Sequence, residues 1–246
     1  MTTHTRLTFH GPLSSARADA IVGRLRANRP RTVLDIGCGW GELLLRVLEA
    51  VPEARGTGVD LDETDLGRGR RSAEERGLAG RVAFLAESAR DTAHGPADLV
   101  LCVGASQAFS DAGCPTAEAL RSLRGLVADG GRVLLGEGIW ERTPTSDELA
   151  GMWPGAAASD HLTLPALLDL AVASGFRPEW TETATLPEWD HFESAYQADQ
   201  EVWLAAHPEA TEVRTRLDRH RAQWMRYRGI LGMAYLTLVP VSGWTA

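Results

Sequence analysis

The chain contains no lysine, because all 25 of its basic residues are arginine. This absence excludes Schiff-base chemistry, the attachment of pyridoxal phosphate and the phosphate-binding lysine of a P-loop. Isoleucine and asparagine are scarce while alanine, glycine and arginine are abundant, which indicates a GC-rich coding bias. The formal net charge of −8 argues against a nucleic acid partner, which would require a basic surface.

Cysteine and long apolar runs are also rare. Cys38, Cys102 and Cys114 are an odd number of thiols without metal-site spacing, so we expect reduced side chains and no metal site. Cys38 and Cys102 lie in or beside predicted strands, which favours a core-filling role. No apolar run approaches the roughly 20 residues that span a bilayer, and residues 1–10 lack the core of a signal peptide. We therefore expect a cytoplasmic protein without a membrane partner.

The first half of the chain alternates β-branched runs with helical stretches. Strands are expected at 32–36, 56–60, 82–86, 98–103 and 132–137, with helices at 14–27, 42–50, 64–76 and 116–127. Gly130 and Gly131 are expected to form the turn between the last of these helices and the fifth strand. This alternation of strands and helices predicts βαβ units and a doubly wound, Rossmann-like α/β fold.

The second half has a different pattern. Residues 139–160 are expected to form an irregular loop, followed by a helix at 165–174 and a strand at 177–186. Residues 187–228 predict two helices, broken at His207 and Pro208, before a final strand at 231–240. The sheet would then have seven mostly parallel strands. Each late helix is expected to have one aromatic face: Trp189, Phe192, Tyr196 and Trp203 on the first, and Val213, Leu217, Trp224 and Tyr227 on the second.

The most informative segment is Val33-Leu34-Asp35-Ile36-Gly37-Cys38-Gly39-Trp40-Gly41. A strand with an acid near its end leads through glycines at every second position into a helix. The glycines permit a tight turn, and the helix N-terminus offers free N–H groups to a carboxylate. A dinucleotide fingerprint would need its third glycine at position 42, where this chain has Glu42.

This segment resembles motif I of the class I S-adenosylmethionine-dependent methyltransferases, and the resemblance extends over residues 14–137. It implies that S-adenosylmethionine is the cofactor and that Asp35 holds the ammonium group of its methionine moiety. Asp60 would bind the ribose hydroxyls, and Leu61 would pack on the adenine. The other residues implied to line the cofactor are Gly37, Cys38, Gly39, Gly41, Glu87, Ser88, Val103 and Gly104. Two alternatives stay open: Asp60 as a helix cap, and Glu87 as a solvated loop acid.

We expect one methyltransferase domain, residues 1–246, with four parts. These are an N-terminal helical cover (1–30), a cofactor-binding core (31–138), an active-site loop (139–164) and a helical lid (187–229). The late aromatic helices are similar to those of uncharacterised bacterial small-molecule methyltransferases.

Candidate substrate-binding residues come from the segments expected to reach the carboxyl edge of the sheet. They are His10, Trp140, Trp153 and Trp189, and the alternative is that the aromatic positions are ordinary core packing. If the acceptor must lose a proton, His161 and Glu137 are the candidate bases, with His10 and His191 also considered. A loop histidine such as His161 has a surface position as its alternative.

The function predicted is methyl transfer from S-adenosylmethionine to a small molecule. The first alternative is a non-catalytic protein that binds S-adenosylmethionine or S-adenosylhomocysteine. A nicotinamide-dependent oxidoreductase is opposed by Glu42. RNA modification is opposed by the acidic charge and by the segment that follows 98–103, which lacks the Asn/Asp-Pro-Pro-Tyr/Phe motif of base-amino methyltransferases.

Overall fold

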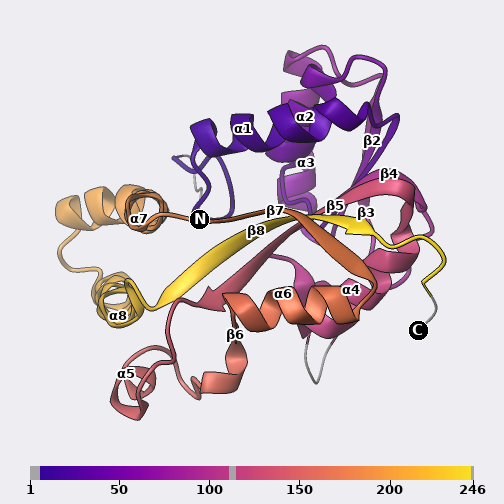
Figure 1. Ribbon diagram of the computed structural model, residues 1–246. Helices are drawn as coiled ribbons and strands as arrows, with labels where there is room; N and C mark the ends of the chain where they lie inside the picture. The colour runs from indigo at the N-terminus through magenta and orange to yellow at the C-terminus, as the bar shows by residue number, and fades with distance from the viewer. Residues whose placement is uncertain (1–5, 111–114, 245–246) are drawn as a thin grey trace. The chain divides into compact units, whose positions relative to one another are not determined.

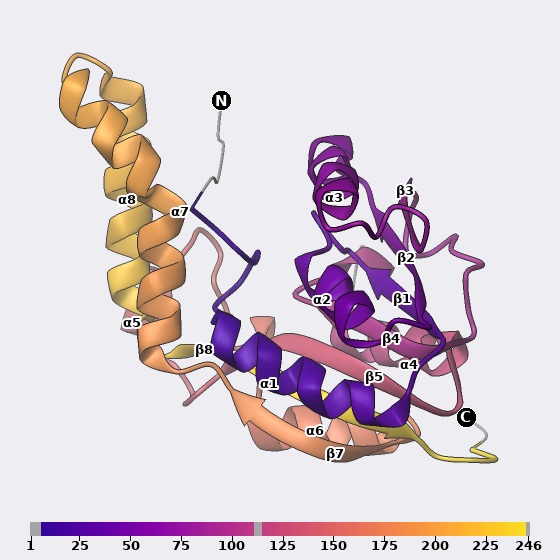
Figure 2. The same ribbon diagram turned by 90° about the horizontal axis from the view of Figure 1, so that it is seen from above.

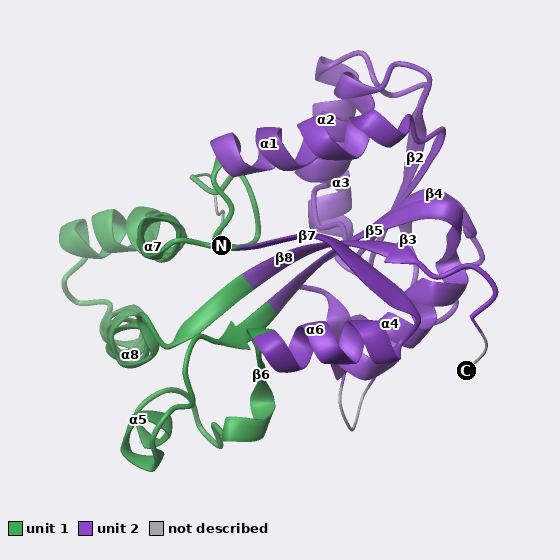
Figure 3. Cartoon of the chain, viewed as in Figure 1, with its two compact units in different colours: residues 1–14, 138–164, 183–233 green, residues 15–137, 165–182, 234–246 purple. Residues whose placement is uncertain are grey.

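The computed structural model describes residues 6–110 and 115–244. They divide into two compact units (Figure 3). Unit 1 comprises residues 1–14, 138–164 and 183–233, and unit 2 comprises residues 15–137, 165–182 and 234–246. Cys114 and the start of the N-terminal segment, residues 1–5, lie outside the described residues.

A mostly parallel sheet forms the framework of the fold (Figure 1). Its main strands are β1 (Thr32–Ile36), β2 (Arg55–Asp60), β3 (Val82–Ala86), β4 (Ala97–Val103), β5 (Val127–Trp140), β7 (Phe176–Thr183) and β8 (Leu231–Pro240). They follow the order β3-β2-β1-β4-β5-β8-β7, and the short strand β6 (Leu162–Thr163) pairs with the end of β5. β1 lies between β2 and β4 and is parallel to both. The predicted doubly wound α/β fold is confirmed, and its strand order reverses between β1 and β4, where such sheets bind ligands.

The helices of unit 2 are α1 (Ser15–Leu25), α2 (Glu42–Ala50), α3 (Glu63–Glu75), α4 (Pro115–Leu126) and most of α6 (Leu164–Ala173). α1 and α2 lie side by side in Figures 1 and 2. The helix expected at 14–27 is present as α1, and its residues Ile21, Val22 and Leu25 are buried. α2 begins at Glu42 as expected and buries an almost continuous leucine face, so it fixes the turn that precedes it against the sheet.

The expected turn at Gly130 and Gly131 is wrong. β5 begins at Val127 and continues through both glycines. Its register against β4 shifts between Ala97 and Leu99, and Gly130 has a φ of 76°, so the glycines accommodate an irregularity within the strand. A Cβ atom on Gly131 would lie 2.7 Å from the carbonyl oxygen of Asp98. Glycine at position 131 therefore allows the backbone of β5 to approach that of β4 closely.

The helices of unit 1 are α5 (Ser146–Ala150), α7 (Leu186–Ala206) and α8 (Thr211–Tyr227). The expected irregular loop at 139–160 is partly wrong, because β5 runs to Trp140 and α5 begins with a capping box of Thr145 and Glu148. Residues 141–145 and 151–157 are irregular as expected. The expected break at His207 and Pro208 is confirmed, since it lies between α7 and α8. These two helices lie side by side in Figures 1 and 2.

One expected helix face is partly wrong. Trp203 on α7 is 45% exposed, whereas Glu193, Ala195 and Gln197 are the buried side chains of this helix. A search of the described ranges finds no helix with the length and apolar character needed to span a membrane.

Candidate cofactor site and active-site residues

The turn between β1 and α2 is built on glycines with a left-handed backbone. Gly37, Gly39 and Gly41 have φ values of 62°, 53° and 67°. A Cβ atom on Gly37 would lie 2.4 Å from the Cβ of Ala105, and one on Gly41 would lie 2.4 Å from the ring of Phe84. The turn therefore lies so close to its neighbours that larger side chains would not fit.

Asp35 lies next to last in β1, immediately before this turn, and is only 6% exposed. In the described part of the chain, no group donates a hydrogen bond to its carboxylate or forms an ion pair with it. Burial, and secondly the nearby Asp60 carboxylate, raise the pKa of Asp35 to about 8. A buried carboxylate of this kind is suited to a cationic ligand group, because such a group would offset its desolvation.

Asp60 ends β2, which is the neighbour of β1 in the sheet. Its Oδ2 accepts a hydrogen bond from the backbone N–H of Gly39 at 2.8 Å, and its Oδ1 accepts one from that of Asp62 at 3.0 Å. Asp62, not Asp60, caps α3, since its side chain accepts from the N–H groups of Thr64 and Asp65. Each carboxylate oxygen of Asp60 retains acceptor capacity, and the helix-cap alternative for this residue does not hold.

Three further residues lie beside these acids along the same edge. Leu61 follows Asp60 and is 77% exposed. Glu87 follows β3, and its Oε2 lies 3.1 Å from Nε2 of His94. Its Oε1 is buried and has no hydrogen-bond partner among the described residues. The Oγ of Ser88 accepts from the backbone N–H of Arg90 at 3.3 Å. Glu87 is therefore a half-buried acid with a free acceptor atom, rather than a fully solvated one.

The ends of β4 and β5 complete this edge. The backbone N–H of Gly104, which follows Val103, donates to the carbonyl of Gly136 at 2.9 Å. The hydroxyl of Ser106 donates a short hydrogen bond to Oε2 of Glu137. The carboxylate of Glu137 stands beside the end of β4, where it helps burial raise the pKa of the Cys102 thiol.

The environment of each of the two described cysteines disfavours the reactive thiolate. Burial raises the pKa of Cys38 and of Cys102 well above the ordinary thiol range, and neighbouring carboxylates raise them further. Cys102 is fully buried and Cys38 is half-buried, so both behave as small apolar residues.

Unit 2 thus brings the sequence-predicted cofactor residues together at one edge of a parallel sheet. The paired strands end at matching positions, so their carboxyl ends meet. The residues gathered there are Asp35, Gly37, Cys38, Gly39, Gly41, Asp60, Leu61, Glu87, Ser88, Val103, Gly104 and Glu137.

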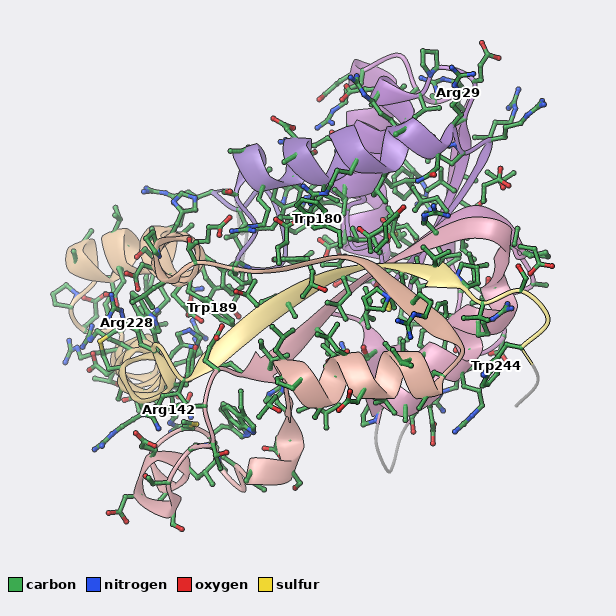
Figure 4. The ribbon with its side chains drawn as sticks, in the orientation of Figure 1. Arg29, Arg142, Trp180, Trp189, Arg228 and Trp244 are labelled. Carbon is green, nitrogen blue, oxygen red and sulfur yellow. The ribbon has the colours of Figure 1, made fainter. Side chains whose placement is uncertain are left out.

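In unit 1 a second set of predicted residues forms a ring cluster. The rings of Trp140 and Trp153 are stacked, with centroids 6.0 Å apart. His161 lies edge-on to both, at 5.0 Å and 6.1 Å, and Tyr227 lies 6.2 Å from Trp153. Trp189, which is labelled in Figure 4, lies 6.3 Å from Tyr227. We call these five residues the ring cluster.

His161 is partly buried, so the alternative of a surface position does not hold for this histidine. Burial lowers its pKa more strongly than the neighbouring Asp160 raises it, so the imidazole is neutral at pH 7. Asp160 binds other groups, because its Oδ2 accepts from Nε1 of Trp153 at 3.2 Å and from the N–H of Ala157 at 3.0 Å. A Cβ atom on Gly138 would lie 2.9 Å from the His161 ring, so Gly138 leaves room for the imidazole.

The other histidine candidates lie elsewhere in unit 1. His10 is exposed in the segment before α1, and His191 is exposed on α7.

Sequence reasoning missed a buried polar network behind the ring cluster. The carboxylate of Glu193 is 3% exposed, accepts from the Tyr227 hydroxyl at 2.6 Å and lies 2.7 Å from Nε2 of His220. The spacing could have identified it, because Trp189, Glu193 and Gln197 follow one another at four-residue intervals along α7.

The fold and the edge residues of unit 2 define a Rossmann-like site for a nucleoside-containing ligand, with acids on β1 and β2. Residues 33–131 match the family model of a methyltransferase domain. The chain is 31% identical over 237 residues to the uncharacterized protein YjhP of Escherichia coli (strain K12). This match covers 94% of this chain and 93% of that protein.

Two solved structures extend this likeness. A SAM-dependent methyltransferase from Geobacter sulfurreducens, in complex with S-adenosyl-L-homocysteine, is similar with a TM-score of 0.85 and 28% identity, over 97% of this chain and 96% of that one. One from Thiobacillus denitrificans, in complex with the same molecule, has a TM-score of 0.84 and 28% identity, over 96% of both chains. The chain belongs to the class I S-adenosylmethionine-dependent methyltransferase superfamily, and S-adenosylmethionine is its cofactor.

The residues present fit this cofactor. Asp35 is a buried carboxylate without a partner in the described part of the chain, and Glu87 has a buried acceptor atom without one. The exposed Leu61 lies beside Asp60 at the end of β2. These groups match, in that order, an ammonium, an adenine amino group and an adenine face.

Proposed function

We propose that the protein transfers the methyl group of S-adenosylmethionine to a small organic acceptor. The observation that carries this proposal is the buried Asp35 carboxylate beside Asp60, at the carboxyl ends of adjacent strands. One carboxylate suits the ammonium group and the other suits the ribose hydroxyls. When bound, the cofactor supplies a methyl group on a sulfonium, which reacts by in-line displacement.

We assign the remaining residues of this edge to the same ligand. The Oε1 atom of Glu87 would accept from the adenine amino group, and Leu61 would cover one face of the adenine. Ser88 would close the turn beside Glu87. The glycine turn of 37–41 and the backbone of Val103 and Gly104 would pass close to the methionine arm, since no large side chain fits there.

We assign acceptor binding to His10, Trp140, Trp153 and Trp189. The three tryptophans belong to the ring cluster, and an apolar, water-poor surface favours the alignment on which displacement depends. If the acceptor must lose a proton, a neutral His161 has the protonation state that a base requires at pH 7. Glu137, which already accepts from Ser106, is the second candidate base.

Two observations favour a small acceptor over a nucleic acid. The net charge of −8 opposes phosphate backbones. The segment after β4 begins with Gly104, Ala105 and Ser106, so it has no Pro-Pro motif for a planar base amino group.

The test combines binding with turnover. A ligand at 100 times its Kd stabilises a protein by about 2.7 kcal/mol, which corresponds to a Tm increase of roughly 5–11 °C for a chain of this size. We expect that increase with S-adenosylhomocysteine and none with NAD; the reverse result would refute the proposal.

Release of S-adenosylhomocysteine is then measured with a panel of small hydroxyl, amine and carbon acceptors. Turnover of any member supports a methyltransferase. Binding of the cofactor without turnover across the whole panel would favour a protein that only binds it.

A further inference from the structure

α8 has one face against α7 and another that lines open cavities. The first face carries His220 and Tyr227, which both contact Glu193 of α7. The second face carries Thr215, Arg219 and Ala222, at spacings of four and three residues. The second face is not used by the packing of the helix pair.

Two cavities meet along this second face. One, of about 410 Å³, lies between residues 149–156 and α8. Its apolar wall includes Leu149, Met152, Trp153 and Ala222, and its polar wall consists of Arg219 and Gln223. The other, of about 420 Å³, is lined by Glu212, Arg216 and Arg219 with two threonines. Both volumes fall in the range of small-ligand sites, and Arg219 belongs to both.

Arg219 and Arg226 are the arginines of α8 that have no partner among the described residues, and of these two Arg219 lines the cavities. The other three arginines of α8 have partners: Arg214 donates to the carbonyl of Pro208, Arg216 to Gln200, and Arg221 pairs with Glu201 and Asp218. Arg228, which directly follows α8, pairs with Asp190 and is labelled in Figure 4. Within residues 6–110 and 115–244, the Arg219 guanidinium forms neither an ion pair nor a hydrogen bond.

The first cavity has the composition of an anion site. No acidic residue lines it, although the chain as a whole is acidic. A guanidinium presents parallel N–H groups that match the two oxygens of a carboxylate or phosphate. Trp153, Met152 and Leu149 offer an apolar wall to the body of the same ligand. Glu212 disfavours an anion in the second cavity.

We propose that the cavity between residues 149–156 and α8 binds a small oxyanion, a carboxylate or phosphate ester on a flat apolar body. Arg219 binds the oxyanion, Gln223 offers its amide, and Trp153 covers the body. The site shares no residue with the cofactor edge of unit 2. Because Trp153 also stacks on Trp140 and lies against His161, a bound ligand contacts the ring cluster directly.

The test uses benzoate and phenyl phosphate as probes, with benzamide as the neutral analogue of benzoate. Binding to the full-length protein is measured by saturation-transfer NMR and calorimetry. We expect both anions to bind and benzamide to fail. In Arg219→Gln the affinity should fall by about tenfold or more, as for loss of a charge-assisted pair of hydrogen bonds. Whichever anion binds more tightly identifies the source of the oxyanion.

Arg221→Gln is the matched control, because Arg221 lies on the same helix, is paired with Glu201 and lines neither cavity. It should bind the probes like the wild type. Ala222→Phe keeps Arg219 but fills the cavity, so it should abolish binding. Circular dichroism and Tm confirm that each variant is folded.

Three results would overturn the proposal: equal binding to Arg219→Gln and the wild type, equal binding of benzamide and benzoate, or no binding of either anion at millimolar concentration. Displacement of the probes by S-adenosylhomocysteine would place them at the cofactor residues and also refute it. The proposal does not depend on methyl transfer, so a protein without turnover can still confirm it.

Discussion

Asp35 should make the stability of the cofactor-free protein depend on pH. Its pKa rises from 3.8 to about 8 on folding, mainly through burial. An acid with a raised folded-state pKa stays protonated when folded but ionises when unfolded, so stability is lost as the pH rises from about 4 to about 8. At about 1.4 kcal/mol for each pKa unit, the full loss is about 6 kcal/mol.

Asp35→Asn removes this loss, because asparagine has nearly the same shape and does not ionise. The free energy of unfolding of the variant, relative to wild type, should therefore rise by about 4 kcal/mol between pH 5 and pH 8.5. Urea denaturation at a series of pH values measures this difference, and comparison at each pH cancels the titrating groups that do not interact with Asp35. A difference that stays constant over this range would refute the pKa argument.

The same residue predicts how cofactor affinity varies with pH. If the Asp35 carboxylate holds the ammonium group, it must lose its proton on binding. The affinity for S-adenosylhomocysteine should then rise by about tenfold per pH unit below pH 8, with release of about 0.9 proton at pH 7. Calorimetry in two buffers with different ionisation enthalpies counts the protons. Asp35→Asn should bind S-adenosylhomocysteine weakly and without this pH dependence. A wild-type affinity that does not change with pH would show that Asp35 does not bind the ammonium group.

Four further substitutions test the two units. Asp60→Ala should weaken S-adenosylhomocysteine binding by about 2–4 kcal/mol in calorimetry, because it removes a charged pair of acceptors. Gly41→Ala should lower the free energy of unfolding by about 2–4 kcal/mol in urea, because φ is 67° and the new Cβ would meet Phe84. Glu193→Leu should cost about 2–4 kcal/mol in the same assay, since it breaks a buried network. His161→Ala should lower turnover by about 10²–10⁴ once an acceptor is found, with unchanged S-adenosylhomocysteine affinity.

Two of these substitutions have a matched control. Asp62→Ala removes the cap of α3, so it should cost about 1 kcal/mol of stability without a change in affinity. Equal loss of affinity in both aspartate variants would show that helix order, not Asp60, is responsible. Glu201→Leu, at an exposed ion pair of α7, should cost less than about 1 kcal/mol. A similar cost at Glu193 would contradict its buried role, and normal turnover in His161→Ala would exclude it as the base.

The sequence by itself determined the cofactor half of the protein. β1, β3 and α2 occur at the expected residues, and Asp35, Gly37 and Asp60 meet at one edge. These elements could be predicted because they depend on nearby residues. An apolar run, a glycine turn and an acid at a strand end specify one βαβ unit. The helix pair α7 and α8 could be predicted for the same reason, since proline and helical periodicity act over a few residues.

Tertiary structure alone decided the features that depend on distant partners. The sequence predicts a turn at Gly130 and Gly131, but both glycines lie within β5, which pairs with β4 on either side of them, at Val127 and at Arg132. Glu193 belongs to no motif that the sequence offered, and it is buried because Tyr227 and His220 satisfy its carboxylate from another helix. Trp203 shares the sequence pattern of the half-buried aromatics of α7, yet it is 45% exposed, close to the end of the helix. Burial is a property of what packs opposite a residue, and no local pattern contains that information.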